Sequence, residues 1–100
     1  MYKVKYSNQA EVDLYDAIEY IAKESVSIAL DYLSGYEENI NLLQENPFMG
    51  IECKIKLINR DCRVLIYKSH IIIYKINSED HEILIIRVHH QSEDYKNTYN

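Results

Sequence analysis

The clearest structural pattern in the chain is the stretch CRVLIYKSHIIIYKINSEDHEILIIRVH, residues 62–89. It contains three runs rich in isoleucine, valine, leucine and tyrosine, at residues 62–68, 71–76 and 82–89. Short runs of β-branched and aromatic residues are typical of strands. The polar turns between the runs are only a few residues long, whereas parallel strands need a crossover of roughly a dozen residues or more. The stretch therefore predicts consecutive antiparallel strands.

Two further strands are predicted on the N-terminal side of this stretch. Residues 52–58 form another such run, and residues 59–61 supply the turn that joins it to the next strand. Residues 2–6 alternate between apolar and polar side chains, which indicates a short N-terminal strand. The chain thus begins with a separate strand and ends in a four-stranded antiparallel meander.

Between these strands, apolar residues recur at helical spacing in two successive segments. Ser7 or Asn8 caps the first segment, which ends near Glu24, and Ser25 or Ser27 caps the second. The two apolar stripes are Ala10, Leu14, Ala17, Ile18 and Ile21, followed by Ala29, Leu33, Tyr36, Ile40 and Leu43. This pattern predicts two amphipathic helices.

The second helix is expected to end at Asn46, because the residue before Pro47 disfavours the α-helical conformation. Gly35 lies inside this helix, where we expect the two helices to approach each other closely. The chain is therefore expected to be one α+β domain, residues 1–100, in the order β-α-α-β-β-β-β. A helical hairpin would cover one face of the antiparallel sheet and leave the other face partly open.

The composition, with 47% hydrophobic and 27% charged residues, is that of a single globular domain. No apolar run approaches the roughly 18 residues of a membrane span, and the first residues lack a signal-peptide segment, so we expect a cytoplasmic protein. Cys53 and Cys62 either face each other across a hairpin or are buried free thiols, and we expect free thiols. Metal-ligand spacings, phosphate-binding glycine loops and serine-nucleophile motifs do not occur, so we expect no metal and no cofactor.

The formal net charge of −5 is distributed unevenly along the chain. Residues 1–50 carry three basic and nine acidic side chains, whereas residues 53–68 carry five basic side chains against one acidic. The overall charge argues against general binding to nucleic acid, but the basic stretch permits a local site for an anion. Alternatively, the strand lysines protect sheet edges from pairing with other chains.

Three cations of this basic stretch are candidates for a functional site. Lys54 and Lys56 are two residues apart on a predicted strand, so their side chains share a face, and Arg63 opens the next strand. Cations that converge on one face can hold a phosphodiester and stabilise the charge that develops on it. His90 and Tyr95, at and beyond the end of the last strand, are candidates for protonating a leaving oxygen.

Other polar residues of the last strands have structural explanations. Arg87 lies within an isoleucine-rich run, where a charge needs a partner, so we expect an ion pair with a helix carboxylate. His89 and His90 face opposite sides of the sheet, so at most one of them can join the basic site, and both alternatively form a polar strand end. His70 and His81 fall in predicted turns, and we expect no role for them.

Over nearly its whole length the sequence resembles the RelE/ParE superfamily of bacterial type II toxins. The resembling residues, in chain order, are Ala10, Asp13-Leu14, Ile18, Tyr20-Ile21, Leu43, Pro47, Gly50, Arg63-Val64-Leu65, Tyr67, Ile71-Ile72-Ile73-Tyr74, Ile86-Arg87-Val88-His89-His90 and Asp94-Tyr95. Lys54, Lys56 and Arg63 are similar in type and spacing to the cations around the scissile phosphate in RelE-like nucleases. However, Gln91 stands where those enzymes have a further catalytic arginine, and Tyr95 comes two residues earlier than their catalytic tyrosine. The chain is therefore more similar to ParE-like toxins.

This resemblance implies a toxin that is neutralised by a cognate antitoxin in a hetero-oligomer. For a ParE-like toxin it implies inhibition of DNA gyrase, with Lys54, Lys56 and Arg63 in the contact surface. The alternative is a RelE-like, metal-independent endonuclease that cleaves mRNA in the ribosome, with these three residues, His90 and Tyr95 as catalytic groups. A second alternative is a non-toxic binding module with the same fold.

Overall fold

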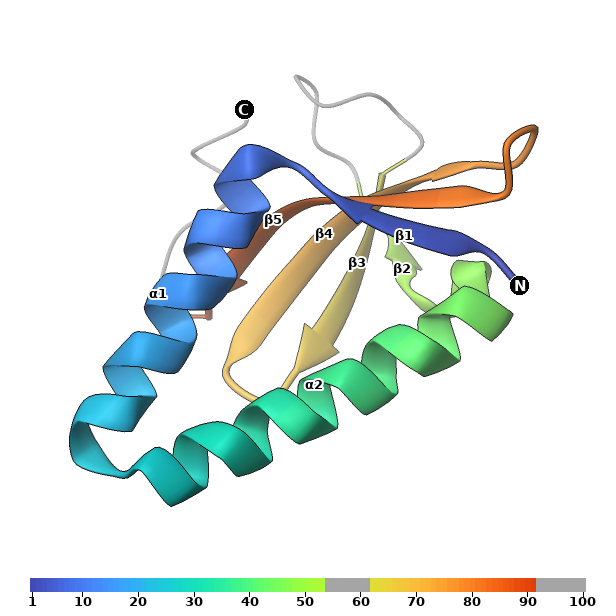
Figure 1. Ribbon diagram of the computed structural model, residues 1–100. Helices are drawn as coiled ribbons and strands as arrows, with labels where there is room; N and C mark the ends of the chain where they lie inside the picture. The colour runs from blue at the N-terminus through green and yellow to red at the C-terminus, as the bar shows by residue number, and fades with distance from the viewer. Residues whose placement is uncertain (54–61, 92–100) are drawn as a thin grey trace.

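The structure, a computed structural model, describes residues 1–53 and 62–91, and its elements follow the predicted order (Figure 1). The predicted strand at residues 52–58 falls largely outside these residues. The elements are β1 (Lys3–Tyr6), α1 (Asn8–Glu24), α2 (Val26–Glu45), a short 3-10 helix η1 (Pro47–Met49), β2 (Ile51–Glu52), β3 (Cys62–Tyr67), β4 (His70–Asn77) and β5 (Glu82–His90).

The strands form one five-stranded sheet in the order β1-β5-β4-β3-β2. Strands β2 to β5 make the predicted antiparallel meander, with an irregularity in the β4–β5 register between Ile73 and Tyr74. Strand β1 pairs in parallel with β5, so that Lys3 lies opposite Glu82 and Tyr6 opposite Ile85. The parallel direction is possible because both helices lie between these strands in the chain and supply the long crossover that parallel pairing needs.

Serine side chains cap both helices. The Ser7 hydroxyl accepts a hydrogen bond from the backbone N–H of Ala10 at 3.0 Å, and the Ser25 hydroxyl accepts one from Ile28 at 3.2 Å. These bonds satisfy N–H groups that have no partner within the first turn of a helix. Of the alternatives left open by the sequence, the caps are therefore Ser7 and Ser25.

Both helices contribute to a hydrophobic core on one face of the sheet (Figure 1). Its buried members are Ala10, Tyr32, Tyr36, Ile40, Leu43, Tyr67, Ile72, Tyr74, Ile83, Ile85 and Val88. Five members of the predicted stripes are buried, namely Ala10, Ala29, Tyr36, Ile40 and Leu43. The other five are only partly buried, and Tyr32, which was not predicted, is buried next to Leu33. Both positions satisfy helical spacing, and Tyr32 is selected because its ring packs edge-on against Tyr67, with centroids 4.9 Å apart.

Gly35 provides space for a tyrosine of the sheet, which corrects the expectation that it allows close approach of the two helices. A Cβ atom at Gly35 would meet the hydroxyl of Tyr67 and lie 3.2 Å from its Cζ. The Tyr67 hydroxyl donates a hydrogen bond to the carbonyl of Tyr32 at 2.9 Å. The absence of a side chain at Gly35 thus lets a strand residue bond to the helix backbone.

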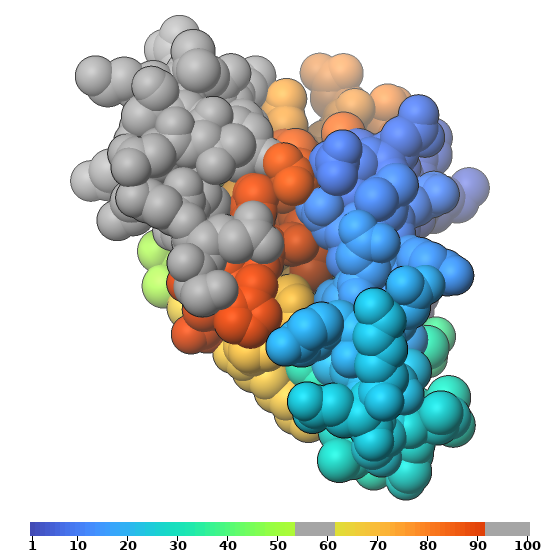
Figure 2. All heavy atoms as spheres, turned by 90° about the vertical axis from the view of Figure 1, so that its left-hand side faces the viewer, coloured from blue at the N-terminus to red at the C-terminus, as the bar shows by residue number. Residues whose placement is uncertain are grey.

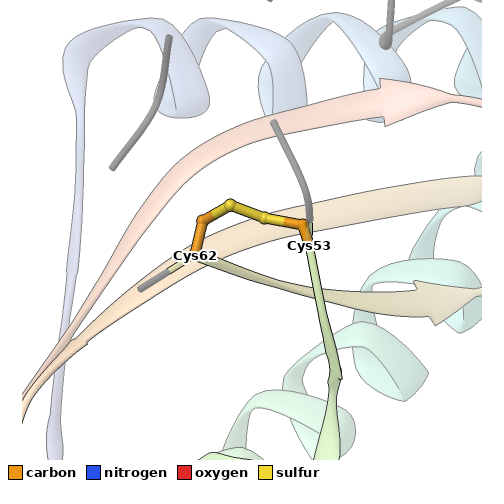
Figure 3. Close-up of a disulfide and its surroundings, with 2 residues drawn as sticks. All are labelled: Cys53 and Cys62. Carbon is orange, nitrogen blue, oxygen red and sulfur yellow. A yellow bond between two sulfur atoms is a disulfide. The ribbon is translucent and has the colours of Figure 1, made fainter. Parts of the chain in front are cut away.

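The cysteines form a disulfide, so the expectation of free thiols was wrong (Figure 3). The antiparallel register that pairs Glu52 with Arg63 brings Cys53 opposite Cys62, with Cα atoms 5.5 Å apart. This spacing lies within the range that a disulfide can bridge. Both cysteines are buried in a second apolar cluster with Ile71 and Ile73.

Candidate functional site

Arg63 is held at the start of β3 by the turn that precedes β2. Its Nη1 donates hydrogen bonds to the carbonyls of Gly50, at 2.7 Å, and Phe48, at 3.3 Å. Its guanidinium carbon lies 4.9 Å from the centroid of the Phe48 ring, within the range of a cation–π contact. The turn itself is anchored by Tyr74, whose hydroxyl donates to the Pro47 carbonyl at 2.8 Å and accepts the N–H of Gly50 at 3.0 Å. Arg63 therefore presents its charge from a fixed position.

Arg63 lines a groove of about 740 Å³ at the end of the sheet that carries the β4–β5 turn. The charged side chains along this groove are Lys5, Glu52, Arg63, Lys75, Glu79 and Glu82. Lys5 and Glu82 form a salt bridge at 2.8 Å, and the hydrogen bond that Lys5 donates to Glu82 raises the pKa of Lys5. Among the described residues, the groove has three cations and three carboxylates. This balance suits a partner with mixed charges better than a polyanion.

Three of the predicted site residues, Lys54, Lys56 and Tyr95, lie outside the described residues. In the sequence, Lys54 directly follows Cys53, and Arg63 directly follows Cys62. The disulfide therefore links the two residues that directly precede Lys54 and Arg63 in the sequence.

His90 lies toward the other end of the sheet from Arg63. Arg63 is opposite Tyr74, which is opposite Ile85, and His90 follows five residues later in β5. At about 3.3 Å per strand residue, this offset is on the order of 15 Å. As predicted, the two histidines that end β5 differ in orientation, because His89 is buried and His90 exposed.

His90 instead adjoins His70, and the expectation that His70 lies in a turn and has no role was wrong about its position. His70 is the first residue of β4, is buried, and lies opposite His90 with ring centroids 5.3 Å apart. Its Nδ1 is hydrogen-bonded to the hydroxyl of Tyr32 in α2. Burial raises the pKa of Tyr32 to about 12. The turn of the β3–β4 hairpin is shorter than predicted, because Lys68 adopts a positive φ of 50° that reverses the chain within two residues.

Arg87 forms the predicted ion pair with a helix carboxylate. Its Nε donates to Asp13 Oδ2 at 2.7 Å, and its Nη2 donates to Oδ1 at 3.2 Å. The same carboxylate accepts the backbone N–H of Val88 at 2.9 Å and the side-chain amide of Gln9 at 3.0 Å. Burial opposes ionisation, but these hydrogen bonds outweigh it and hold the pKa of Asp13 below its usual value. Asp13 thus joins α1 to β5, which lie side by side in Figure 2.

Within residues 1–53 and 62–91, no cluster of three or more histidine, cysteine, aspartate or glutamate side chains has an arrangement suited to a metal ion. Neither described helix combines the length and apolar character needed to cross a membrane.

Solved toxin structures have the same fold. The chromosomal ParDE toxin–antitoxin system from P. aeruginosa contains a chain with a TM-score of 0.68 and 23% identity, with coverage of 90% of this chain and 96% of that one. The RelBE2 toxin–antitoxin complex from Mycobacterium tuberculosis contains a chain with a TM-score of 0.62 and 21% identity, with coverage of 89% and 96%. The isolated RelE toxin of E. coli has a TM-score of 0.63 and 11% identity, with coverage of 98% and 93%. At these identities, the similarity concerns the fold.

The family is identified by the sequence itself. No curated protein sequence matches the chain significantly. However, residues 4–95 match the family described as the ParE toxin of the type II toxin–antitoxin system, parDE. This match includes every helix and strand of the sheet apart from the first residue of β1. The chain therefore belongs to the ParE toxin family.

Proposed function

We propose that the protein is the toxin of a type II toxin–antitoxin pair and inhibits DNA gyrase through a protein–protein contact surface that includes Arg63. Membership of the ParE toxin family supports the toxin assignment. Arg63 suits a contact surface because its bonds to Gly50 and Phe48 position its charge before a partner arrives. Lys54 and Lys56 are proposed to belong to the same surface.

The separation of Arg63 from His90 favours this target over RNA. In a metal-free nuclease, the cation that stabilises the phosphate and the acid that protonates the leaving oxygen must reach the same phosphodiester. The register places His90 five strand residues beyond the position opposite Arg63. His90 is therefore poorly placed for this role, and a nuclease would depend on Tyr95 as its acid.

We further propose that a cognate antitoxin neutralises the toxin and contacts its helical layer with a basic segment. Helices α1 and α2 carry nine acidic side chains and a single basic one, Lys23. A basic segment would associate with this surface faster at low ionic strength. An association rate that does not change between low and high salt would contradict the electrostatic part of this proposal.

The target can be identified by inducible expression in a bacterial host with pulse labelling of DNA, RNA and protein synthesis. We expect DNA synthesis to stop first. Early loss of translation, together with cleaved mRNA ending in 2′,3′-cyclic phosphate, would instead support the ribosome-dependent nuclease. Undisturbed growth in the presence of folded protein would instead support the second alternative, a non-toxic binding module with the same fold.

The contact residue can be tested with purified protein in a gyrase supercoiling assay. We expect Arg63→Ala to weaken inhibition at least tenfold, equivalent to about 1.4 kcal/mol of contact energy. Lys3→Ala is the matched control, because it removes one exposed charge from the far edge of the sheet and should leave inhibition unchanged. Thermal melting of both variants separates loss of contact from loss of fold. Equal inhibition by folded Arg63→Ala would exclude Arg63 from the surface.

A further inference from the structure

The disulfide adjoins β2, the shortest of the described strands. Strand β2 consists of two residues, Ile51 and Glu52, both exposed, and forms the edge of the sheet with β3 as its neighbour. Beyond these residues, the N–H of Cys53 donates to the carbonyl of Cys62 at 3.0 Å, and the disulfide joins the same two residues (Figure 3). A pairing of so few residues has little stability of its own.

The two ends of β2 are held by different means. On the N-terminal side, Gly50 is bonded to the Tyr74 hydroxyl through its N–H and to Arg63 through its carbonyl. On the C-terminal side, the covalent bond from Cys53 to Cys62 holds the strand. If this bond were cut, the C-terminal end of β2 would be held by backbone hydrogen bonds to β3 and by the packing of Cys53 against its apolar neighbours.

We propose that the Cys53–Cys62 disulfide is a redox-sensitive staple that keeps β2 on the edge of β3, and that a dithiol reductant releases the C-terminal end of β2. In this exchange the reductant supplies two electrons and two protons. One S–S bond breaks to give two cysteine thiols, while the two sulfurs of the reductant join as its own disulfide. The protein then changes between a stapled edge and an edge that opens locally, with the rest of the fold kept.

The release affects the surface proposed above as the gyrase contact, and this consequence rests on that proposed function. Arg63 directly follows Cys62 and bonds to the carbonyl of Gly50, which directly precedes β2. The sequence between the cysteines also contains Lys54 and Lys56. Reduction would therefore loosen the pairing of Cys53 with Cys62, the residue that directly precedes Arg63, and reduced protein is expected to inhibit gyrase several-fold more weakly than oxidised protein.

Amide hydrogen exchange of the full-length protein tests the staple without reference to any target. The Cys53 amide is the reporter, because it donates to Cys62. The Val88 amide, which is bonded to Asp13 between α1 and β5, is the internal control. On addition of dithiothreitol, we expect the Cys53 amide to exchange at least tenfold faster and the Val88 amide to remain unchanged. In the double variant Cys53→Ala/Cys62→Ala, both amides should be insensitive to the reductant.

Three results would overturn the proposal. One is an intact mass that shows two free thiols in the air-oxidised protein. Another is an unchanged exchange rate of the Cys53 amide after reduction, which would mean that packing alone holds β2. The third is equal acceleration at Val88, which would mean global unfolding. If the exchange pattern appears as expected but neither redox form inhibits gyrase, the staple stands and the proposed target fails.

Discussion

The carboxylate of Asp13 in α1 receives two hydrogen bonds from the guanidinium of Arg87 in β5 and a third from the backbone N–H of Val88. Both side chains are largely withdrawn from solvent, with exposed fractions of 10% for Asp13 and 22% for Arg87. Strand β1 ends at Tyr6, so it does not continue along this part of β5. Asp13 therefore provides the acceptor that a neighbouring strand would otherwise supply.

Replacement of Asp13 by asparagine should lower the free energy of unfolding by about 2–4 kcal/mol, because the Arg87 charge loses the Asp13 carboxylate in a partly buried position. Asp16→Asn is the matched control. It lies on the exposed face of the same helix and should change stability by less than about 0.5 kcal/mol. Urea unfolding measures both values. Equal stability of the two variants would contradict the importance of the Asp13–Arg87 pair.

The same pair predicts a specific response to acid. The folded-state pKa of Asp13 lies below its unfolded value, so its contribution is complete above the unfolded value of about 3.9 and is lost as the pH falls through the folded pKa. Wild-type protein should therefore lose more free energy of unfolding than Asp13→Asn when the pH is lowered from about 5 to below 3.9. Urea unfolding at a series of pH values measures the difference. Parallel curves for the two proteins would show that Asp13 is not coupled to folding.

Gly35→Ala should destabilise the protein by about 1–3 kcal/mol, although alanine is normally the better helix former by about 1 kcal/mol. The added methyl group would meet the Tyr67 hydroxyl. Ser34→Ala, at the exposed neighbouring position, should have an effect of less than about 0.5 kcal/mol. The double variant Gly35→Ala/Tyr67→Phe should lose less free energy of unfolding than the sum of the losses in the two single variants. Full additivity, measured by urea unfolding, would refute this contact.

Tyr74→Phe should cost about 1–3 kcal/mol, because the buried Gly50 N–H and the Pro47 carbonyl each lose a hydrogen-bond partner. Tyr15→Phe, on the exposed face of α1, is the control and should be neutral. Since the Gly50 N–H loses its acceptor, Tyr74→Phe should also speed amide exchange at Gly50. Thermal melting and hydrogen exchange provide the two measurements. A neutral Tyr74→Phe would mean that the turn before β2 does not depend on this hydroxyl.

Features with a local cause could be predicted from the sequence. The helix caps, the end of α2 before Pro47 and the antiparallel order of β2 to β5 follow from residues close together in the chain. The ion pair of Arg87 was also predictable, since a charge within an apolar strand requires a partner. The candidate site was predicted less completely, because the sequence could not show that Arg63 and His90 lie toward opposite ends of the sheet.

The type and order of the elements follow from the sequence alone, because the periods of apolar residues and the turn lengths depend on neighbouring side chains. Which distant residues meet depends on the tertiary structure. It placed β1 beside β5, joined His70 to Tyr32, positioned Tyr67 above Gly35 and brought Cys53 opposite Cys62. Each of these contacts depends on strand register or on the packing of α2 across the sheet. Several registers and several choices of buried helical position satisfy the same local pattern, and the close packing of the whole core selects among them.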